Sequence, residues 1–269
     1  SSTVKTTTPN MHQTRFFPSP LVSLCLLIYL FCTEPSLQAQ IQVSVPTIEQ
    51  EATSIWLTIN VIEFLEQLGH YIQLPDHEVI KAMLAKSKNQ QFGSADFPRI
   101  YELLESSIYD PDKYTAALEK VRAQEPLLNA MIARLKQDRT SWPWEFKTFE
   151  TYSVVFTLYG TGGSYDPDQG LVTLFTNEAG GFMGYPNPAY TIIHEIVHMG
   201  IEQSIVQPHQ LSHGLKERIV DRVTYLLFGE QLPDYRVQNM GDPQIDAYLA
   251  KVEDVQHLEA QVRKYLEER

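Results

Sequence analysis

Hydrophobic residues recur at the spacing of a helix face through the first half of the chain. Between residues 51 and 140, apolar positions return every three or four residues, which is the period of an amphipathic helix. Glycine, or Asp-Pro and Glu-Pro pairs, mark several boundaries between these stretches. The pattern predicts helices at residues 55–68, 76–84, 97–108, 110–123 and 127–136.

The spacing of hydrophobic positions changes after a junction at residues 141–144, which contains two tryptophans. The segments Tyr152–Tyr159 and Leu171–Phe175 are rich in β-branched and aromatic residues, and a glycine-rich loop separates them. We expect the two segments to be strands of one hairpin. Helical spacing then returns at residues 188–199, 215–228 and 244–268.

This order of elements predicts an α+β fold that is mainly helical and contains a small antiparallel β-hairpin. We expect a helical N-terminal region at residues 40–140, which begins with an extended linker at 40–50. Residues 141–269 form the second region, with the hairpin and a C-terminal helix. A chain of 269 residues has room for one large or two small domains.

Residues 1–39 have the pattern of a polar tail followed by a secretory signal peptide. An apolar run at 21–32 precedes small residues that end at Ala39. The run is shorter than the roughly 20 residues that span a bilayer, although an uncleaved anchor is the alternative interpretation. Both cysteines lie in this run, so the expected mature chain has no disulfide and no thiolate ligand. We therefore expect a secreted or periplasmic protein, and the lack of disulfides and of Asn-x-Ser/Thr sites favours a bacterial one.

The formal charge of −12 argues against a phosphate backbone as a partner. No run of basic residues counters that charge. The sequence thus predicts no nucleic-acid partner, and after signal cleavage it predicts no membrane partner. It does not indicate an oligomeric state.

The segment His194-Glu195-Ile196-Val197-His198 carries the clearest chemical signal. On a helix, His194 and His198 share one face, and two imidazoles at this spacing can bind one Zn²⁺. Glu195 would then lie beside the metal, where a carboxylate can take a proton from a water molecule. The alternative interpretation is that both histidines are core residues that bind no metal.

Further candidates follow this segment. Glu217 on the next helical stretch can be a third ligand, and Asp221 one turn later can hydrogen-bond the outer nitrogen of a ligand histidine. His209 and His213 lie in the connection, and either can stabilise an oxyanion or be a further ligand. His209 is also an alternative to Glu217 as the third ligand. Tyr225 and Tyr235 are additional candidates.

The compound pattern His194-Glu195-x-x-His198 followed by Glu217-x-x-x-Asp221 resembles the gluzincin clan of zinc metallopeptidases, the thermolysin-like and neprilysin-like enzymes. The resemblance covers about residues 150–230. It implies a zincin-like domain in which His194, His198 and Glu217 bind zinc, Glu195 is the general base and Asp221 supports a ligand. It also implies that one strand of the expected hairpin is the edge of the sheet that a peptide substrate joins.

The sequence therefore predicts a secreted zinc-dependent peptidase that acts on a peptide or protein substrate. One alternative is a non-catalytic protein of the cell envelope with a structural zinc site, which requires four protein ligands. Another is a helical binding module in which the motif occurs by chance and no metal binds.

Overall fold

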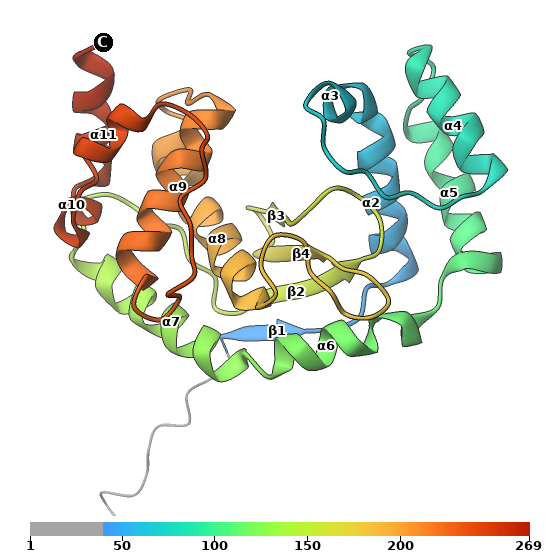
Figure 1. Cartoon of the computed structure of the whole chain (residues 1–269), viewed down its shortest axis with the longest axis horizontal. Coiled ribbons are helices and arrows are strands. Elements are labelled where there is room, and N and C mark those ends of the chain that lie inside the picture. The colour runs from blue at the N-terminus through green and yellow to red at the C-terminus, as the bar shows by residue number, and fades with distance from the viewer. Residues whose placement is uncertain (1–39) are drawn as a thin grey trace, which may run out of the picture. The chain divides into compact units, whose positions relative to one another are not determined.

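A four-stranded mixed sheet lies at the centre of the described part of the chain. The computed structural model describes residues 40–269, so the predicted signal peptide lies outside the described residues. The strands are β1 (Ile41–Val43), β2 (Tyr152–Thr157), β3 (Ser164–Asp166) and β4 (Leu171–Phe175), in the spatial order β1-β2-β4-β3. Helices pack around this sheet (Figure 1), which confirms the predicted α+β class.

The expected antiparallel hairpin between the segments that form β2 and β4 is wrong. These two strands are parallel neighbours, with Val154 opposite Val172. The glycine-rich connection is more than a loop, because it returns along the sheet as β3 and pairs antiparallel with β4. The predicted linker at 40–50 is also wrong, because β1 pairs parallel with β2. The strands β2 and β4 thus both have neighbours on two sides, so the expectation that one of them is the sheet edge is wrong; β3 is an edge strand instead.

Most of the predicted helices are present, with shifted boundaries. Those before β2 are α2 (Ile48–Asn60), α3 (Ile62–Gln67), α4 (Glu78–Lys88), α5 (Phe97–Leu103), α6 (Thr115–Arg122) and α7 (Glu125–Asp138). The first begins well before the expected residue 55, because Thr47 and Gln50 form a capping box at its N-terminus. Short 3₁₀ or π-helical turns lie at Ser94–Asp96, Leu104–Ile108, Pro111–Tyr114, Arg139–Ser141, Glu202–Val206 and Pro243–Ala247.

The helices after the sheet are α8 (Pro188–Ile201), α9 (His213–Phe228), α10 (Val252–Gln256) and α11 (Leu258–Glu267). The single helix expected at 244–268 is therefore divided into a turn and two helices. His257 interrupts it with a non-helical backbone between α10 and α11. Within residues 40–269, no helix combines the length and the apolar character needed to cross a bilayer.

Two clusters of buried side chains form the interior. The larger cluster joins residues of the sheet, of α6 and α7, and of the C-terminal helices, such as Val154, Leu128, Ile193 and Ile219. It therefore takes residues from both sides of position 140. The smaller cluster joins α2, α4 and α5.

The helix α8 is the most deeply buried helix of the site region. Asn187 caps it by accepting a hydrogen bond from Ala189 N at 2.9 Å, and Pro188 occupies its first turn. Every residue of α8 except Thr191 is buried. Near its C-terminal end, a Cβ atom at Gly200 would lie 1.9 Å from the Phe146 ring, so only glycine allows this close packing.

Glu51 on α2 is a buried carboxylate next to the end of β2. Its Oε1 accepts hydrogen bonds from Tyr114 Oη at 2.6 Å and from Leu158 N at 2.9 Å. Its Oε2 is buried and has no hydrogen-bond partner among the described residues. Burial raises the pKa of this carboxyl group above its usual value, although the hydrogen bonds oppose that shift.

The replacement Glu51→Gln tests this buried ionisation. A carboxyl group whose pKa is raised by folding costs stability as the pH rises from about 4.5 to the folded-state pKa. The free energy of unfolding of the unsubstituted chain should therefore fall relative to that of Glu51→Gln across this pH range. Urea unfolding between pH 4 and pH 8 measures the difference, with the exposed Glu49→Gln as the matched control. If the difference in unfolding free energy between the two chains stays constant with pH, folding does not raise the pKa of Glu51.

Candidate metal centre

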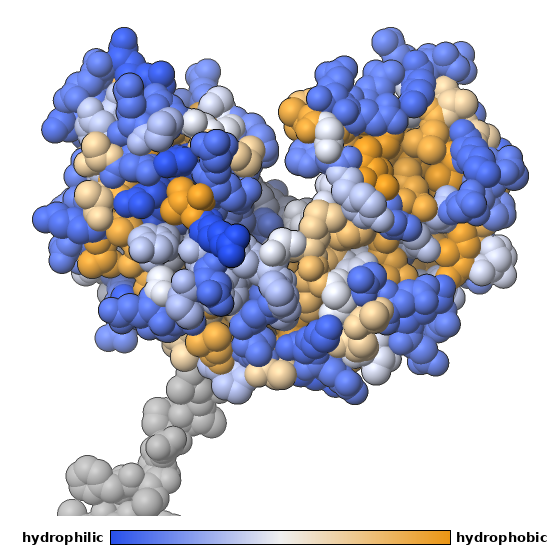
Figure 2. All heavy atoms as spheres, viewed as in Figure 1, coloured by the Kyte–Doolittle hydropathy of each residue, from blue (hydrophilic) through white to orange (hydrophobic). Residues whose placement is uncertain are grey.

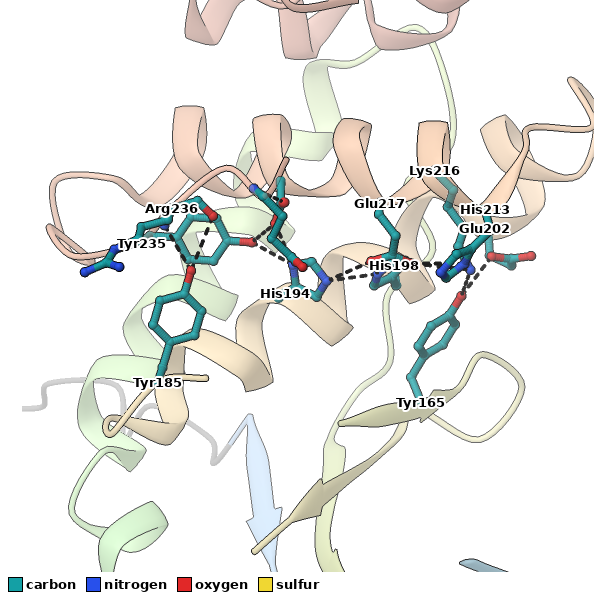
Figure 3. Close-up of polar contacts among 12 residues, drawn as sticks. Tyr165, Tyr185, His194, His198, Glu202, His213, Lys216, Glu217, Tyr235 and Arg236 are labelled. Carbon is teal, nitrogen blue, oxygen red and sulfur yellow. Dashed lines mark hydrogen bonds and ion pairs between the residues drawn. The ribbon is translucent and has the colours of Figure 1, made fainter. Parts of the chain in front are cut away.

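Two packed helices bring three predicted ligands to one point. His194 and His198 come from α8, and Glu217 comes from α9, whose N-terminus Ser212 caps (Figure 3). The Nε2 atoms of the two histidines lie 3.0 Å apart. Glu217 Oε2 lies 3.2 Å from His198 Nε2 and 3.5 Å from His194 Nε2.

These separations fit the donor set of a zinc ion. Tetrahedral ligands with zinc bonds of 2.0–2.1 Å are about 3.3 Å from one another. The three atoms form a triangle of nearly this size, and both histidines are almost fully buried. Among the described residues, this is the one group of three or more His, Cys, Asp or Glu side chains arranged to hold a metal ion. Three protein ligands leave one position of a tetrahedral site for water or substrate.

His194 is oriented by two groups behind it. Its Nδ1 lies 2.6 Å from Tyr235 Oη and 3.2 Å from Asp221 Oδ1. Tyr235 Oη donates to Asp221 Oδ1 at 2.8 Å, and Gln238 N donates to Asp221 Oδ2 at 2.7 Å. A proton on Nδ1 directs the lone pair of Nε2 toward the candidate metal position. Asp221 therefore lies where the sequence predicts, and Tyr235 is a second partner of the same nitrogen.

His198 is held in a different way. Its Nδ1 is buried and has no hydrogen-bond partner in the described part of the chain. The Tyr165 ring on β3 stacks on its imidazole, with centroids 4.9 Å apart and planes at 11°. Tyr165 Oη donates to Glu202 Oε2 at 3.1 Å and accepts from Lys216 Nζ at 3.3 Å (Figure 3). Tyr165 thus joins the edge strand to both ligand helices.

The protonation states of the ligands follow from burial and from these contacts. Burial would lower the pKa of His194, but hydrogen bonds to Asp221 and Glu217 raise it to about 10. Burial lowers the pKa of His198 to about 4. Burial alone would raise the pKa of Glu217, yet its hydrogen bonds to both histidines lower it. His198 and Glu217 are therefore in the states that a cation requires, whereas His194 must release a proton when a cation binds.

Glu195 lies against the loop that leads into β3. A Cβ atom at Gly163 would be 2.8 Å from Glu195 Oε1, so the chain at Gly163 lies close against this carboxylate. Burial raises the pKa of Glu195 to about 7, and the neighbouring charge of His194 opposes that shift. A carboxyl group with a pKa near neutrality can both take and return a proton.

The two histidines His209 and His213 have different surroundings. His213 Nδ1 lies 3.6 Å from Glu217 Oε1, so this residue borders the candidate metal centre. His209 Nε2 lies 3.7 Å from Glu259 Oε1 on α11 and is outside the group of three ligands. The geometry therefore gives no support to His209 as a ligand or a catalytic group. Lys216, whose Nζ is 3.9 Å from Glu217 Oε1, is a cation at the site that the sequence did not indicate.

Tyr165 is the main site residue that sequence reasoning missed. It belongs to a segment interpreted as a loop, and no spacing rule links it to the histidines on α8. The Ser164–Asp166 register opposite Leu171–Thr173 is what places its ring beside His198. Of the two additional tyrosines, Tyr235 is at the site, whereas Tyr225 is exposed on α9.

Comparisons with protein-family models, with curated proteins and with solved structures gave no match for this chain. The motif and the geometry of its residues are therefore the basis for a functional proposal.

The replacement Tyr235→Phe should weaken zinc binding about tenfold, because groups that orient a ligand histidine contribute 10–100-fold to metal affinity and Asp221 would still contact Nδ1. Competition with a zinc chelator of known affinity measures the change. Tyr225→Phe removes an exposed hydroxyl group from α9 and is the matched control. Equal affinities of the two variants would exclude a supporting role for Tyr235.

For Tyr165, the ring and the hydroxyl group can be tested separately. Tyr165→Leu removes the stacked ring and should weaken zinc binding about tenfold, whereas Tyr165→Phe keeps the ring and should bind zinc nearly as tightly as the unsubstituted chain. The same chelator competition applies, with circular dichroism to verify folding. If Tyr165→Phe loses as much affinity as Tyr165→Leu, stacking is not what orients His198.

Proposed function

We propose that this chain is a zinc-dependent peptidase of the gluzincin type. The observation that carries the proposal is the convergence of His194, His198 and Glu217 within 3.0–3.5 Å. Glu195, which the motif places beside them, is a buried carboxyl group with a raised pKa. This combination of a three-ligand site and an adjacent base is the one that metal-assisted hydrolysis of peptide bonds requires.

The arrangement of elements supports a zincin-like interpretation of the fold. The ligand helix α8 packs against β3 and β4, and β3 is the antiparallel edge strand of an otherwise parallel sheet. An edge strand has backbone groups available for pairing with an extended peptide. We propose that β3 is the strand that a substrate joins, which would bring the substrate backbone alongside the ligand helix.

The residues would divide the chemistry among them. His194, His198 and Glu217 would hold zinc, which when bound polarises a carbonyl group and lowers the pKa of water to about 7. Glu195 would take a proton from the attacking water and later give it to the leaving amine. His213, exposed beside Glu217, is the connection histidine that lies close enough to serve an oxyanion, and Lys216 is a second cation there.

The alternative of a structural zinc site in a non-catalytic envelope protein requires a fourth protein ligand. The candidate group within residues 40–269 contains three. A structural zinc site also needs no general base, whereas Glu195 is a buried carboxyl group with a raised pKa next to His194 in the sequence. These two observations favour the catalytic proposal.

Export is part of the proposal and rests on the sequence of residues 1–39 alone, through the apolar run at 21–32 and the small residues that follow it. The action would then take place outside the cytoplasm.

The replacement Glu195→Gln separates zinc binding from catalysis. The purified chain should contain one zinc ion per molecule and should cleave a mixed peptide library, with cleavage lost in a chelator and restored by zinc. Glu195→Gln should keep the zinc and lose activity by about 100-fold or more, since general acid–base catalysis contributes 10²–10⁴-fold. Mass spectrometry of the library identifies the cleaved bonds.

The exposed Glu230→Gln is the matched control for this experiment. Retention of full activity in Glu195→Gln, or a chain that binds stoichiometric zinc without cleaving any peptide, would contradict the proposal.

A further inference from the structure

Residues of α2 and α3 form a wall of a pocket that extends away from the candidate metal centre and shares Gly163 and Tyr165 with it. The pocket has a volume of about 720 Å³, and this wall contributes Leu57, Val61 and Leu65. The opposite side is formed by β3 and by the loop before it, including Gly163, Ser164 and Asp166. Figure 2 shows the surface hollowed between α3 on one side and the helices α8 and α9 on the other, with hydrophobic residues on the side of α3.

The three apolar residues of this wall are spaced four residues apart: Leu57 is on α2, Leu65 is on α3, and Val61 lies between the two helices with a non-helical backbone. Leu57 is 52% exposed and Val61 is 44% exposed. The other face of α2 is buried in the smaller core through Ile55 and Ile59. A stripe of exposed apolar side chains along a pocket wall is typical of a binding surface.

The pocket borders the loop that packs against the candidate catalytic group. Gly163 lines the pocket, and it is also the residue whose backbone lies against Glu195. In the part of the chain that the structure describes, no strand pairs with the outer edge of β3. An extended peptide that pairs with this edge would therefore lie between Glu195 and the wall on α2 and α3.

The alternation of side chains along a strand indicates which peptide side chains would enter the pocket. Tyr165 points toward His198, so its neighbours Ser164 and Asp166 project to the other face of the sheet. Both neighbours line the pocket. A peptide paired with β3 would follow the same alternation, so every second side chain would face the pocket.

The charges of the pocket restrict the side chain that fits. Its charged lining residues are Glu49 and Asp166, and no lysine or arginine lines it. An acidic side chain would meet the carboxylates of Glu49 and Asp166 without a compensating cation. Neutral apolar side chains gain contact with Leu57 and Val61 instead.

We propose that this pocket is a side-chain subsite of the substrate groove, which accepts an apolar residue of an extended peptide and rejects an acidic one. The inference rests on the proposed peptidase function, because that function places the peptide on β3. A second copy of this chain could cover the same apolar wall, and the experiment distinguishes that case.

Binding of labelled peptides to the full chain with Glu195→Gln and bound zinc tests the subsite without turnover. The probes are fluorescein-labelled octapeptides of Gly, Ser and Ala that differ at one central position, which carries Leu, Asn or Glu. We expect the Leu peptide to bind about tenfold more tightly than the Glu peptide, as measured by fluorescence anisotropy. Adding Leu57→Gln should remove most of this preference, and Leu57→Lys should shift it toward the Glu peptide.

The matched control is Phe64→Gln, which removes an equally exposed apolar residue of α3 outside this pocket and should leave the preference unchanged. Equal binding of the three peptides, absence of binding, or an unchanged preference in Leu57→Gln would overturn the subsite. A dimer in light scattering that Leu57→Gln dissociates would also overturn it, by assigning the wall to self-association. If the peptides bind selectively but the unsubstituted chain with zinc cleaves no peptide, the peptidase function is contradicted and the subsite remains supported.

Discussion

The packing of α8 against α9 is the constraint on which the site depends. His194 and His198 share one face of α8, but two side chains do not fix the position of a metal ion. Glu217 from α9 completes the group of three. This grouping requires the close contact of the two helices, and it requires α8 to be fixed in the core on every side. Phe146 against Gly200 and the cap at Asn187 fix the two ends of α8.

The two histidines of the candidate metal centre are oriented by different kinds of interaction. His194 is held by hydrogen bonds to Tyr235 and Asp221, which belong to the same C-terminal part of the chain as α9. His198 is held by the stacked ring of Tyr165, which belongs to the edge strand β3. A peptide that pairs with β3 as proposed would thus contact the strand that supports His198, so its position and the geometry of the candidate metal centre would be linked through Tyr165.

The helices before β2 contribute to the site from a distance. Glu51 joins α2 to the end of β2 by accepting a hydrogen bond from Leu158 N, and so fixes α2 beside the sheet. This contact leaves the Leu57 face of α2 directed at the pocket along β3. The helical region before β2 therefore supplies a wall of the proposed substrate groove.

The sequence by itself determined those features that depend on neighbours a few positions away. The spacing of His194 and His198, the Asn187-Pro188 start of α8 and most helical segments follow from local periodicity and capping. The pattern also indicated Glu217 and Asp221, because one helical turn separates them. Only the tertiary structure decided the parallel pairing of β2 with β4, the addition of β1 to the sheet, and the positions of Tyr165, Tyr235 and His209. Strand partners and ring contacts join residues far apart in the chain, and a periodic pattern along one segment carries no information about which distant segment lies beside it.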